Sequence, residues 1–155
     1  MTGRRSAGLL LYRHPGPAPE VLIGHMGGPF WARRDQAAWS IPKGEYGDDE
    51  EPLAAAVREF EEELGLPAPA APYQPLGEAR QTGGKTVTVW AVEADLDPGT
   101  VVPGTFRMEW PRGSGRVQEF PELDRVAWLP LDRAGDRLVA GQRVFLERLA
   151  ELLGA

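Results

Sequence analysis

The sequence contains no cysteine. Disulfide bonds, zinc–thiolate sites and a cysteine nucleophile are therefore excluded, and the chain is compatible with a reducing cytosol. Long apolar runs are also absent near the N-terminus, where the longest, residues 9–12, is too short for a membrane span or for the core of a secretory signal. We therefore expect a soluble, cytoplasmic protein with no membrane partner.

Positive charge is scarce relative to negative charge. The 155 residues include 17 Lys and Arg against 23 Asp and Glu, which gives a formal net charge of −6. Proteins that bind nucleic-acid polymers usually carry a basic patch, so this balance argues against such a partner. A small phosphorylated ligand stays possible, because a metal ion can bridge its phosphates to acidic side chains.

The order of the predicted elements indicates one α/β domain over residues 1–155. Strand patterns precede and follow a helix between Pro52 and Gly65, and a second helix is predicted at 141–153 with Phe145, Leu149 and Leu152 on its inner face. The predicted strands and extended runs cover residues 6–13, 21–25, 39–43, 76–81, 86–94, 106–110 and 126–129. This order predicts an α+β fold in which helices pack on the faces of a mixed sheet.

The most informative stretch is residues 44–66, GEYGDDEEPLAAAVREFEEELGL. Pro52 stands where a helix can begin, because its missing N–H would have no partner in the first turn. Gly65 stands where a helix can end in a left-handed cap. The apolar residues between them fall on one stripe at helical spacing, which predicts a buried face: Leu53, Ala56, Val57, Phe60 and Leu64.

Three acids lie together beside this stripe. Glu59, Glu62 and Glu63 are three or four residues apart, and like charges at such spacings destabilise an isolated helix by roughly 0.2–0.5 kcal/mol per pair. A divalent cation would offset this repulsion, because Mg²⁺ binds carboxylate oxygens. The competing interpretation is a solvated surface, which we expect for Glu61. Arg58 can hold a neighbouring carboxylate with two hydrogen bonds.

The spacing of these residues resembles the signature box of the Nudix hydrolase superfamily. The box has seven fixed positions and two apolar ones, and all are matched by Gly44, Glu50, Arg58, Glu59, Phe60, Glu62, Glu63, Gly65 and Leu66. The segments SAGLLLYR, WSIPKGE and QEFPELDRVAW extend the resemblance to a bacterial branch over most of the chain. The resemblance implies an α/β/α sandwich in which the box helix lies against the sheet.

The resemblance also implies the chemistry. The family uses Mg²⁺ or Mn²⁺ and water to cleave a nucleoside diphosphate linked to another group. Carried over by position, Glu59, Glu62 and Glu63 are expected to bind the metal, and the carbonyl of Gly44 to complete its coordination. Glu59 or Glu62 is expected to contact the attacking water, and Arg58 to orient a glutamate. Glu50 is expected to be structural, near the positive end of the helix dipole.

The general base is open, because the superfamily places it differently in different branches. A box glutamate is one candidate, and Glu119 and Glu122 in QEFPEL, which we expect to be a loop, are others. Both late acids are equally consistent with solvated loop positions. Glu109, in a half-buried strand pattern, is a weaker candidate. His25 is expected to be a hydrogen-bonded structural residue rather than a catalytic one.

The candidates for substrate contact are Lys43, Trp39, Trp31, Arg80 and Lys85. Lys43 precedes the box and can meet a phosphate as a point charge. Either tryptophan can stack on a base, although tryptophan is more often part of a core. Arg80 and Lys85 flank a predicted hairpin turn and are equally consistent with ordinary surface charges.

Several functions remain open. Pro42-Lys43-Gly44 resembles the dinucleoside-polyphosphate branch, so a pyrophosphohydrolase acting on that small-molecule class is the leading hypothesis. Ordinary or oxidised nucleoside triphosphates are the alternative, and nucleotide sugars come third. A non-catalytic nucleotide-sensing module is a further possibility. The oligomeric state is open, with a homodimer among the options.

Overall fold

The computed structural model describes residues 4–154, so residues 1–3 and 155 of the predicted 1–155 domain lie outside the described residues. The strands are β1 (Arg5–Arg13), β2 (Glu20–Met26), β3 (Trp39–Ser40), β4 (Lys43–Glu45), β5 (Gln74–Arg80), β6 (Thr86–Glu93), β7 (Thr105–Glu109), β8 (Val117–Pro121) and β9 (Leu123–Pro130). The α-helices are α1 (Pro52–Leu64), α2 (Leu131–Arg137) and α3 (Arg143–Leu153), and short 3₁₀ turns are η1 (Thr82–Gly84), η2 (Pro98–Thr100) and η3 (Ala140–Gln142).

The main sheet is mixed, as predicted, and β1 is its centre. Its strand order is β3-β2-β1-β6-β5, and β9 pairs with β2. The strand β1 is parallel to β6 along its length. On its other side β1 changes partner: residues 6–8 pair with β4, whereas residues 12 and 13 pair with β2. On this side β1 therefore has two partners in succession, and the first of them, β4, lies beside α1.

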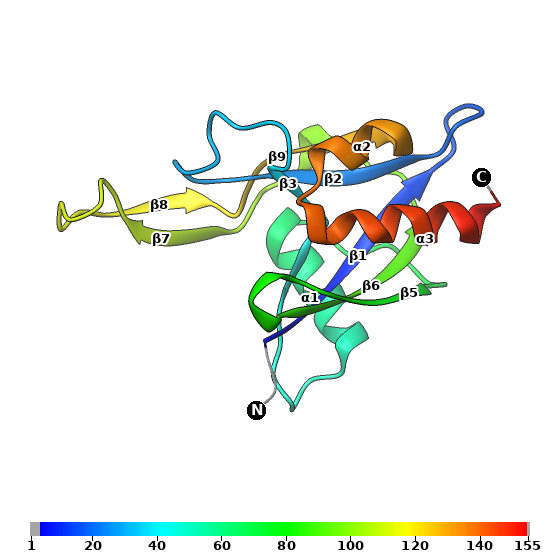
Figure 1. Cartoon of the computed structure of the whole chain (residues 1–155), viewed down its shortest axis with the longest axis horizontal. Coiled ribbons are helices and arrows are strands. Elements are labelled where there is room, and N and C mark those ends of the chain that lie inside the picture. Colours follow the sequence, from blue (N-terminus) through cyan, green and yellow to red (C-terminus); the bar gives the residue numbers. More distant parts are fainter. Residues whose placement is uncertain (1–3, 155) are drawn as a thin grey trace.

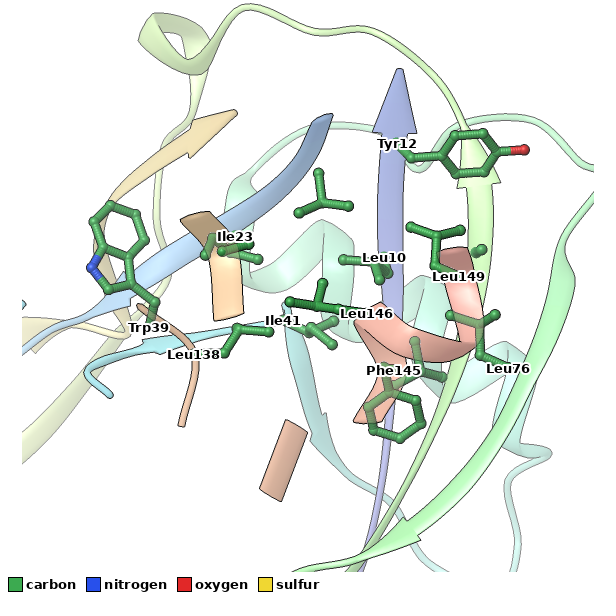
Figure 2. Packing of buried hydrophobic residues seen from close by; sticks show 14 of the residues in the cluster. Leu10, Tyr12, Ile23, Trp39, Ile41, Leu76, Leu138, Phe145, Leu146 and Leu149 are labelled. Carbon is green, nitrogen blue, oxygen red and sulfur yellow. The ribbon is translucent and has the colours of Figure 1, made fainter. Parts of the chain in front are cut away.

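Helices cover both faces of this sheet, which confirms the predicted α/β/α sandwich (Figure 1). Side chains of β1 alternate between two apolar clusters. Leu9 and Leu11 lie in the cluster that contains Phe60 of α1. Leu10 lies in the other cluster, with Phe145 of α3 (Figure 2). This alternation follows from the two-residue period of a strand, and it anchors α1 firmly against β1.

The closing helix differs from its prediction. Its α-helical part begins at Arg143, after η3, rather than at residue 141. Phe145 and Leu149 are buried as predicted, but Leu152 is 43% exposed, so its assignment to the inner face was wrong. Leu146 is buried instead, because the short helix α2, which the sequence analysis did not predict, packs against α3.

The segment QEFPEL was predicted as a loop, and this prediction was wrong. Residues 117–121 form β8, which pairs with β7 as a separate two-stranded sheet. The backbone pairing with β7 stabilises the strand although its residues lack an alternating pattern. Figure 1 shows this hairpin projecting from the body, away from α1. Among the helices of residues 4–154, none is long and apolar enough to cross a bilayer.

Candidate active site

The helix α1 has the predicted ends. Pro52 occupies its first turn, and Gly65 ends it in a left-handed conformation with φ of 67°, where its N–H donates to the carbonyl of Glu61. Phe60 and Leu64 are fully buried against the sheet. Phe60 faces the sheet, and Glu59 and Glu63 on the adjoining side of the helix lie next to β4. Glu63 accepts from the N–H of Lys43, and Glu59 lies against Gly44.

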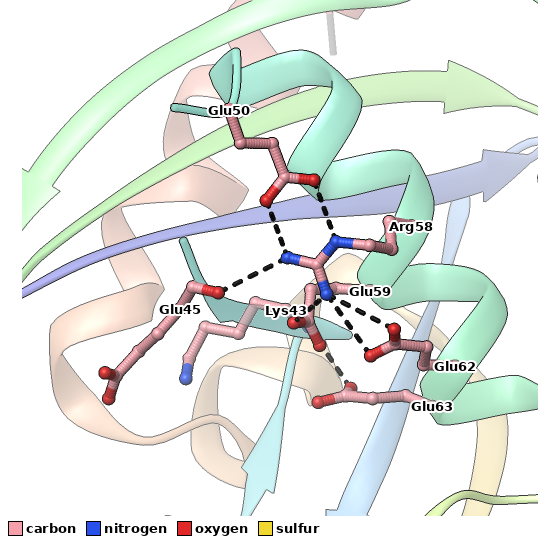
Figure 3. A network of polar contacts seen from close by, with 7 residues as sticks. All are labelled: Lys43, Glu45, Glu50, Arg58, Glu59, Glu62 and Glu63. Carbon is pink, nitrogen blue, oxygen red and sulfur yellow. Dashed lines mark hydrogen bonds and ion pairs between the residues drawn. The ribbon is translucent and has the colours of Figure 1, made fainter. Parts of the chain in front are cut away.

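Arg58 organises the acids of α1 (Figure 3). Its Nε and Nη2 donate to the two carboxylate oxygens of Glu50, each at 2.8 Å. Its Nη1 donates to Glu59 at 2.8 Å and lies 3.3 Å from both carboxylate oxygens of Glu62. The hydrogen bonds from Arg58 lower the pKa of Glu50. Glu50 is therefore structural as expected, but through an ion pair with Arg58 rather than through the helix dipole alone.

An acidic cavity of about 420 Å³ opens between α1, β4 and the end of the β7–β8 hairpin. Its lining comprises Ser6, Lys43, Gly44, Glu45, Glu59, Glu63, Lys85 and Glu122. The backbone N–H of Lys43 donates to Glu63 at 3.2 Å. A Cβ on Gly44 would overlap the carboxylate of Glu59, so a larger residue here would displace that side chain from its present position.

Burial shapes the electrostatics of this acidic cavity. Desolvation raises the pKa of Glu63 to about 8, against the lowering effects of the Lys43 charge and N–H. Burial also raises the pKa of Glu59 and of Glu122. Neighbouring carboxylates add to each of these shifts, and Glu62 contributes to two of them. Ionising these carboxyl groups together is therefore unfavourable in the metal-free protein, and a bound cation would favour their charged forms.

The residues present fit a hard divalent cation in chemistry, although their positions need adjustment. Within residues 4–154, no three acidic or histidine side chains already stand close enough to hold one ion. Glu59 and Glu62 instead accept hydrogen bonds from Arg58. The donor set is nevertheless all oxygen, and the space above Gly44 is kept open by its missing Cβ. A bound ion would compete with Arg58 for the same carboxylates.

A second cavity of about 250 Å³ adjoins the acidic one. The two share Lys43, Glu63 and Glu122 in their linings. The remaining lining of this aromatic cavity is Met26, Gly27, Trp31, Ser40, Phe106 and Leu123. The arrangement joins a charged compartment to an apolar one, which is suited to a ligand with a phosphate end and a flat apolar end.

The pattern of the whole chain agrees with this geometry. The NUDIX domain family model matches residues 2–149. The chain belongs to the NUDIX family. Its fold is similar to that of an Ap4A hydrolase of C. elegans in a binary complex, with a TM-score of 0.68, 20% identity and 98% of each chain covered. It is also similar to RenU, a Nudix hydrolase of M. smegmatis, with a TM-score of 0.61, 26% identity, and coverage of 96% of this chain and 84% of that one.

The sequence identity to some curated proteins is higher, but it extends over a shorter segment. In the RNA pyrophosphohydrolase of Hahella chejuensis, 51 residues are 45% identical to this chain. They make up 32% of this chain and 32% of that protein, so the chain matches about a third of the length of its curated relative. These comparisons support the NUDIX fold and family without fixing a substrate.

The NUDIX structure brings together some of the predicted site residues and not others. Lys43, Gly44, Glu59 and Glu63 line the acidic cavity as a group. Glu62 lines neither cavity, and its side chain is 59% exposed beside Arg58. Their predicted roles stay predictions, and the same holds for the metal.

The structure places Glu119 and Glu122, the two late acids, in different surroundings. Glu119 lies exposed on β8, opposite Arg107 of β7, and lines neither cavity. Glu122 lines both cavities. Its backbone is fixed on either side, since its N–H donates to Gly104 at 2.8 Å and its carbonyl accepts from Gly27 at 3.0 Å. Of the two candidates, Glu122 is the one that the fold brings to the box.

Among the predicted substrate contacts, Trp39 and Arg80 lie away from the two cavities. Trp39 is 5% exposed in the core, and its indole N–H donates to Asp35 at 3.0 Å. Arg80 is exposed at the end of β5. Trp31 lines the aromatic cavity instead, and Lys85 lines the acidic one. The sequence alone does not distinguish the two indoles, because Trp31 lies within residues 26–38, which read as an irregular loop, and Trp39 directly follows them.

Two further expectations can be compared with the NUDIX structure. His25 is fully buried, and its ring nitrogens contact Asp124 at 2.9 Å and the carbonyl of Arg34 at 2.6 Å, so it is structural as expected. Glu109, the weaker base candidate, accepts hydrogen bonds from Gly113 and Gly115 in the hairpin turn. Phe106 was missed by the sequence analysis, although its alternating strand pattern marked it as half-buried.

A larger cavity, of about 740 Å³, lies at the opposite end of β1. Arg13 lines it and is already paired with Glu20 and Asp95, each at 2.9 Å or less. Its guanidinium also covers the ring of Trp128 at 4.3 Å. Because no residue of the box lines this cavity, the acidic cavity carries the stronger case for chemistry.

Proposed function

We propose that this chain is a pyrophosphohydrolase that depends on Mg²⁺ or Mn²⁺ and cleaves a phosphoanhydride bond in nucleoside diphosphate derivatives. The observation that carries the proposal is the acidic cavity, which Glu59, Glu63 and Glu122 line together with Lys43. Carboxylates that crowd together at a buried site are typical of a site that binds a cation and its phosphate ligand.

The residues of the chain have separate tasks in this proposal. Glu59, Glu62, Glu63 and the Gly44 carbonyl would hold the metal, which when bound screens phosphate charge and acidifies a water. The water oxygen bonds to a phosphorus atom, and the bond from that phosphorus to the bridging oxygen breaks. The carboxylate of Glu122 accepts the proton of the water, because burial raises the pKa of this group toward the value useful for a base.

Lys43 and Arg58 act by position. Lys43 lines both cavities, so its ammonium can reach the phosphates of a substrate whose base enters the aromatic cavity. Arg58 keeps Glu59 at its place by a 2.8 Å hydrogen bond and is itself oriented by Glu50. We infer that Arg58 is a positioning residue and that it shares its carboxylates with the metal.

Among small molecules, dinucleoside polyphosphates are the favoured substrate class. Support comes from Pro42-Lys43-Gly44 and from the similarity in fold to a C. elegans Ap4A hydrolase. Ordinary and oxidised nucleoside triphosphates are the alternative, because one aromatic cavity suffices for one base. The partner is then a small nucleotide rather than a membrane or another protein.

The test is a panel of substrates incubated with the pure protein and Mg²⁺, with products identified by mass. The panel holds diadenosine tetraphosphate, ATP, 8-oxo-dGTP and a nucleotide sugar. Glu59→Gln is expected to lower kcat by roughly a hundredfold or more. Glu51→Gln is the matched control, because Glu51 is the exposed N-cap residue of the same helix and its side chain makes no capping hydrogen bond. Turnover of no substrate, or full activity of Glu59→Gln, would refute the proposal.

A non-catalytic nucleotide-sensing module is the second candidate. The observation that favours it is the hold of Arg58 on Glu59 and Glu62, which leaves no ready-made ion site within residues 4–154. Such a module would bind a nucleotide at micromolar concentration by calorimetry without turning it over. Activity of the wild type that is lost in Glu63→Gln would rule it out.

A further inference from the structure

The proposed reaction makes no use of His25, although this side chain lies next to the aromatic cavity. His25 directly precedes Met26 and Gly27, which line that cavity. It is fully buried on β2, and its ring packs edge-on against the ring of Trp39, with centroids 5.4 Å apart. Burying a polar ring costs free energy unless its nitrogens are hydrogen-bonded, so the contacts of these nitrogens indicate what the histidine contributes.

The hydrogen-bond partners of His25 assign the protons of its ring. Its Nε2 lies 2.6 Å from the carbonyl oxygen of Arg34, which can only accept, so Nε2 carries a hydrogen. Its Nδ1 lies 2.9 and 3.0 Å from the two carboxylate oxygens of Asp124. Arg125 places Nη1 3.4 Å from the same carboxylate and favours its ionised form, so Nδ1 is also a donor. His25 is therefore an imidazolium that joins Arg34 to Asp124.

A β-bulge directs Asp124 toward this ring. In the pairing of β2 with β9, His25 is opposite Arg125. The next pair joins Met26 to Leu123, so Asp124 has no cross-strand partner. An extra residue of this kind bends its strand and changes the direction of a side chain. Because Leu123 lines the aromatic cavity, the bulge fixes the carboxylate at the wall of the candidate active site.

Arg34 connects the imidazolium to Trp31. The carbonyl of Arg34 accepts from His25, and its N–H donates to the carbonyl of Trp31 at 2.9 Å, which closes a turn. The guanidinium of Arg34 also covers the rings of Phe30 and Trp31, at 4.4 and 5.8 Å from their centroids. Trp31 itself lines the aromatic cavity. His25 therefore holds the turn that carries one wall of this cavity.

The second half of the same loop has separate anchors. The N–H groups of Ala37 and Ala38 donate to carbonyls at the end of α2, both at 3.0 Å. These bonds do not involve His25. Within the described part of the chain, the bond from His25 is the only hydrogen bond that ties residues 28–34 to the sheet. The two halves of the loop can therefore be perturbed independently.

We propose that His25 is a positioning residue that holds Trp31 where the nucleotide base binds. Its imidazolium is fixed by Asp124 and in turn fixes residues 28–34. Ordering this segment before the ligand arrives removes an entropic cost of binding, and it presents the indole for stacking on a base. The inference deepens the proposed function and rests on it for the identity of the ligand. The anchoring of residues 28–34 does not depend on that function.

NMR of the ring nitrogens tests the charge on His25. The chain has 2 histidines, and His14→Gln identifies the signals of the other one. In the ¹⁵N-labelled wild type at pH 7, both ring nitrogens of His25 are expected to carry a hydrogen. Asp124→Asn is expected to leave a hydrogen on Nε2 alone, because the asparagine amide can donate to a bare Nδ1. A single ring hydrogen in the wild type would overturn the inference.

Two substitutions separate positioning from simple filling of the core. His25→Gln keeps a donor near the place of Nε2, whereas the shorter His25→Asn leaves the Arg34 carbonyl without its donor. His25→Asn is therefore expected to speed amide exchange in residues 28–34 and not in residues 37 and 38. It should weaken binding of ADP with Mg²⁺ roughly tenfold, the equivalent of one charge-assisted hydrogen bond, and raise KM more than it lowers kcat. His25→Gln should retain most of the affinity.

His14→Asn is the matched control, because His14 is exposed just beyond β1. Equal amide exchange of residues 28–34 in His25→Asn and wild type would overturn the inference. Equal loss of ADP affinity in both His25 variants would also overturn it, since that result would indicate a general effect of packing. If His25→Asn does not fold, the NMR result decides.

The proposed function is tested separately by ADP binding and substrate turnover of the wild type. Absence of both, together with the expected NMR and exchange results, would refute the proposed function and leave the anchoring by His25 in place. Turnover by the wild type with unchanged exchange in His25→Asn would refute the positioning role alone.

Discussion

Replacing Glu63 by glutamine tests the electrostatics of the acidic cavity. Glutamine keeps the shape of the side chain and cannot ionise. In the metal-free protein, burial raises the pKa of Glu63 from the ordinary 4.5 to about 8. Between these two pH values the folded protein binds a proton that the unfolded chain has released. The free energy of unfolding therefore falls as the pH rises from 4.5 to 8, and this loss is absent in Glu63→Gln.

The magnitude follows from the pKa difference. One pKa unit corresponds to about 1.4 kcal/mol, so a change from 4.5 to about 8 corresponds to on the order of 4–5 kcal/mol. Solvent screening in the open cavity reduces this figure, and we expect about 2–4 kcal/mol. The wild type should therefore match Glu63→Gln near pH 5 and be less stable by that amount at pH 9.

The assay is urea unfolding of both proteins in EDTA between pH 5 and 9. The difference between them isolates Glu63, because Glu59 and Glu122 titrate in both. In thermal melts, added Mg²⁺ should raise the Tm of the wild type more at pH 9 than at pH 6, because at pH 6 the ion must first displace the proton of Glu63. Glu63→Gln should lose this pH dependence. Parallel stability curves for the two proteins would show that the burial argument is wrong.

Three further substitutions test the framework of the candidate active site. Gly44→Ala should lower kcat roughly a hundredfold with an unchanged circular dichroism spectrum, because its Cβ would displace the Glu59 carboxylate; activity near that of wild type would contradict the close packing. Phe60→Ala should lower the free energy of unfolding by about 3–5 kcal/mol in urea, since Phe60 is fully buried; a loss below 1 kcal/mol would contradict its place in the core. Gln142→Ala should cost about 1–3 kcal/mol in the same assay, because the Ile41 N–H donates to Gln142 at 2.8 Å and would lose its buried acceptor; no change would mean that water replaces it.

The box helix was predictable because its determinants are local. Pro52, the apolar stripe and Gly65 lie within one short stretch, and helix ends depend on residues within a turn. The alternating strands of the sheet were predictable for the same reason. The strand β8 was not, because its residues become a strand only through pairing with β7.

The site was predictable only as far as the box extends. Glu119 and Glu122 are three residues apart in one segment, and their sequence surroundings do not separate them. The separation comes from backbone contacts of Glu122 with Gly104 and Gly27, which lie far away in the chain. Trp39 was predicted to contact substrate but is held in the core through Asp35, a contact that the indole pattern did not indicate.

The central position of β1 has a consequence for how the chain acquires its shape. Residues 5–12 pair in parallel with residues 86–93, a partner that lies beyond the whole of α1 along the chain. Pairings between such distant segments slow folding, because a large loop must close before contacts compensate its entropy. During synthesis, β1 must therefore wait for β6 to emerge. The lining of the acidic cavity is complete only after Glu122 has also been synthesised.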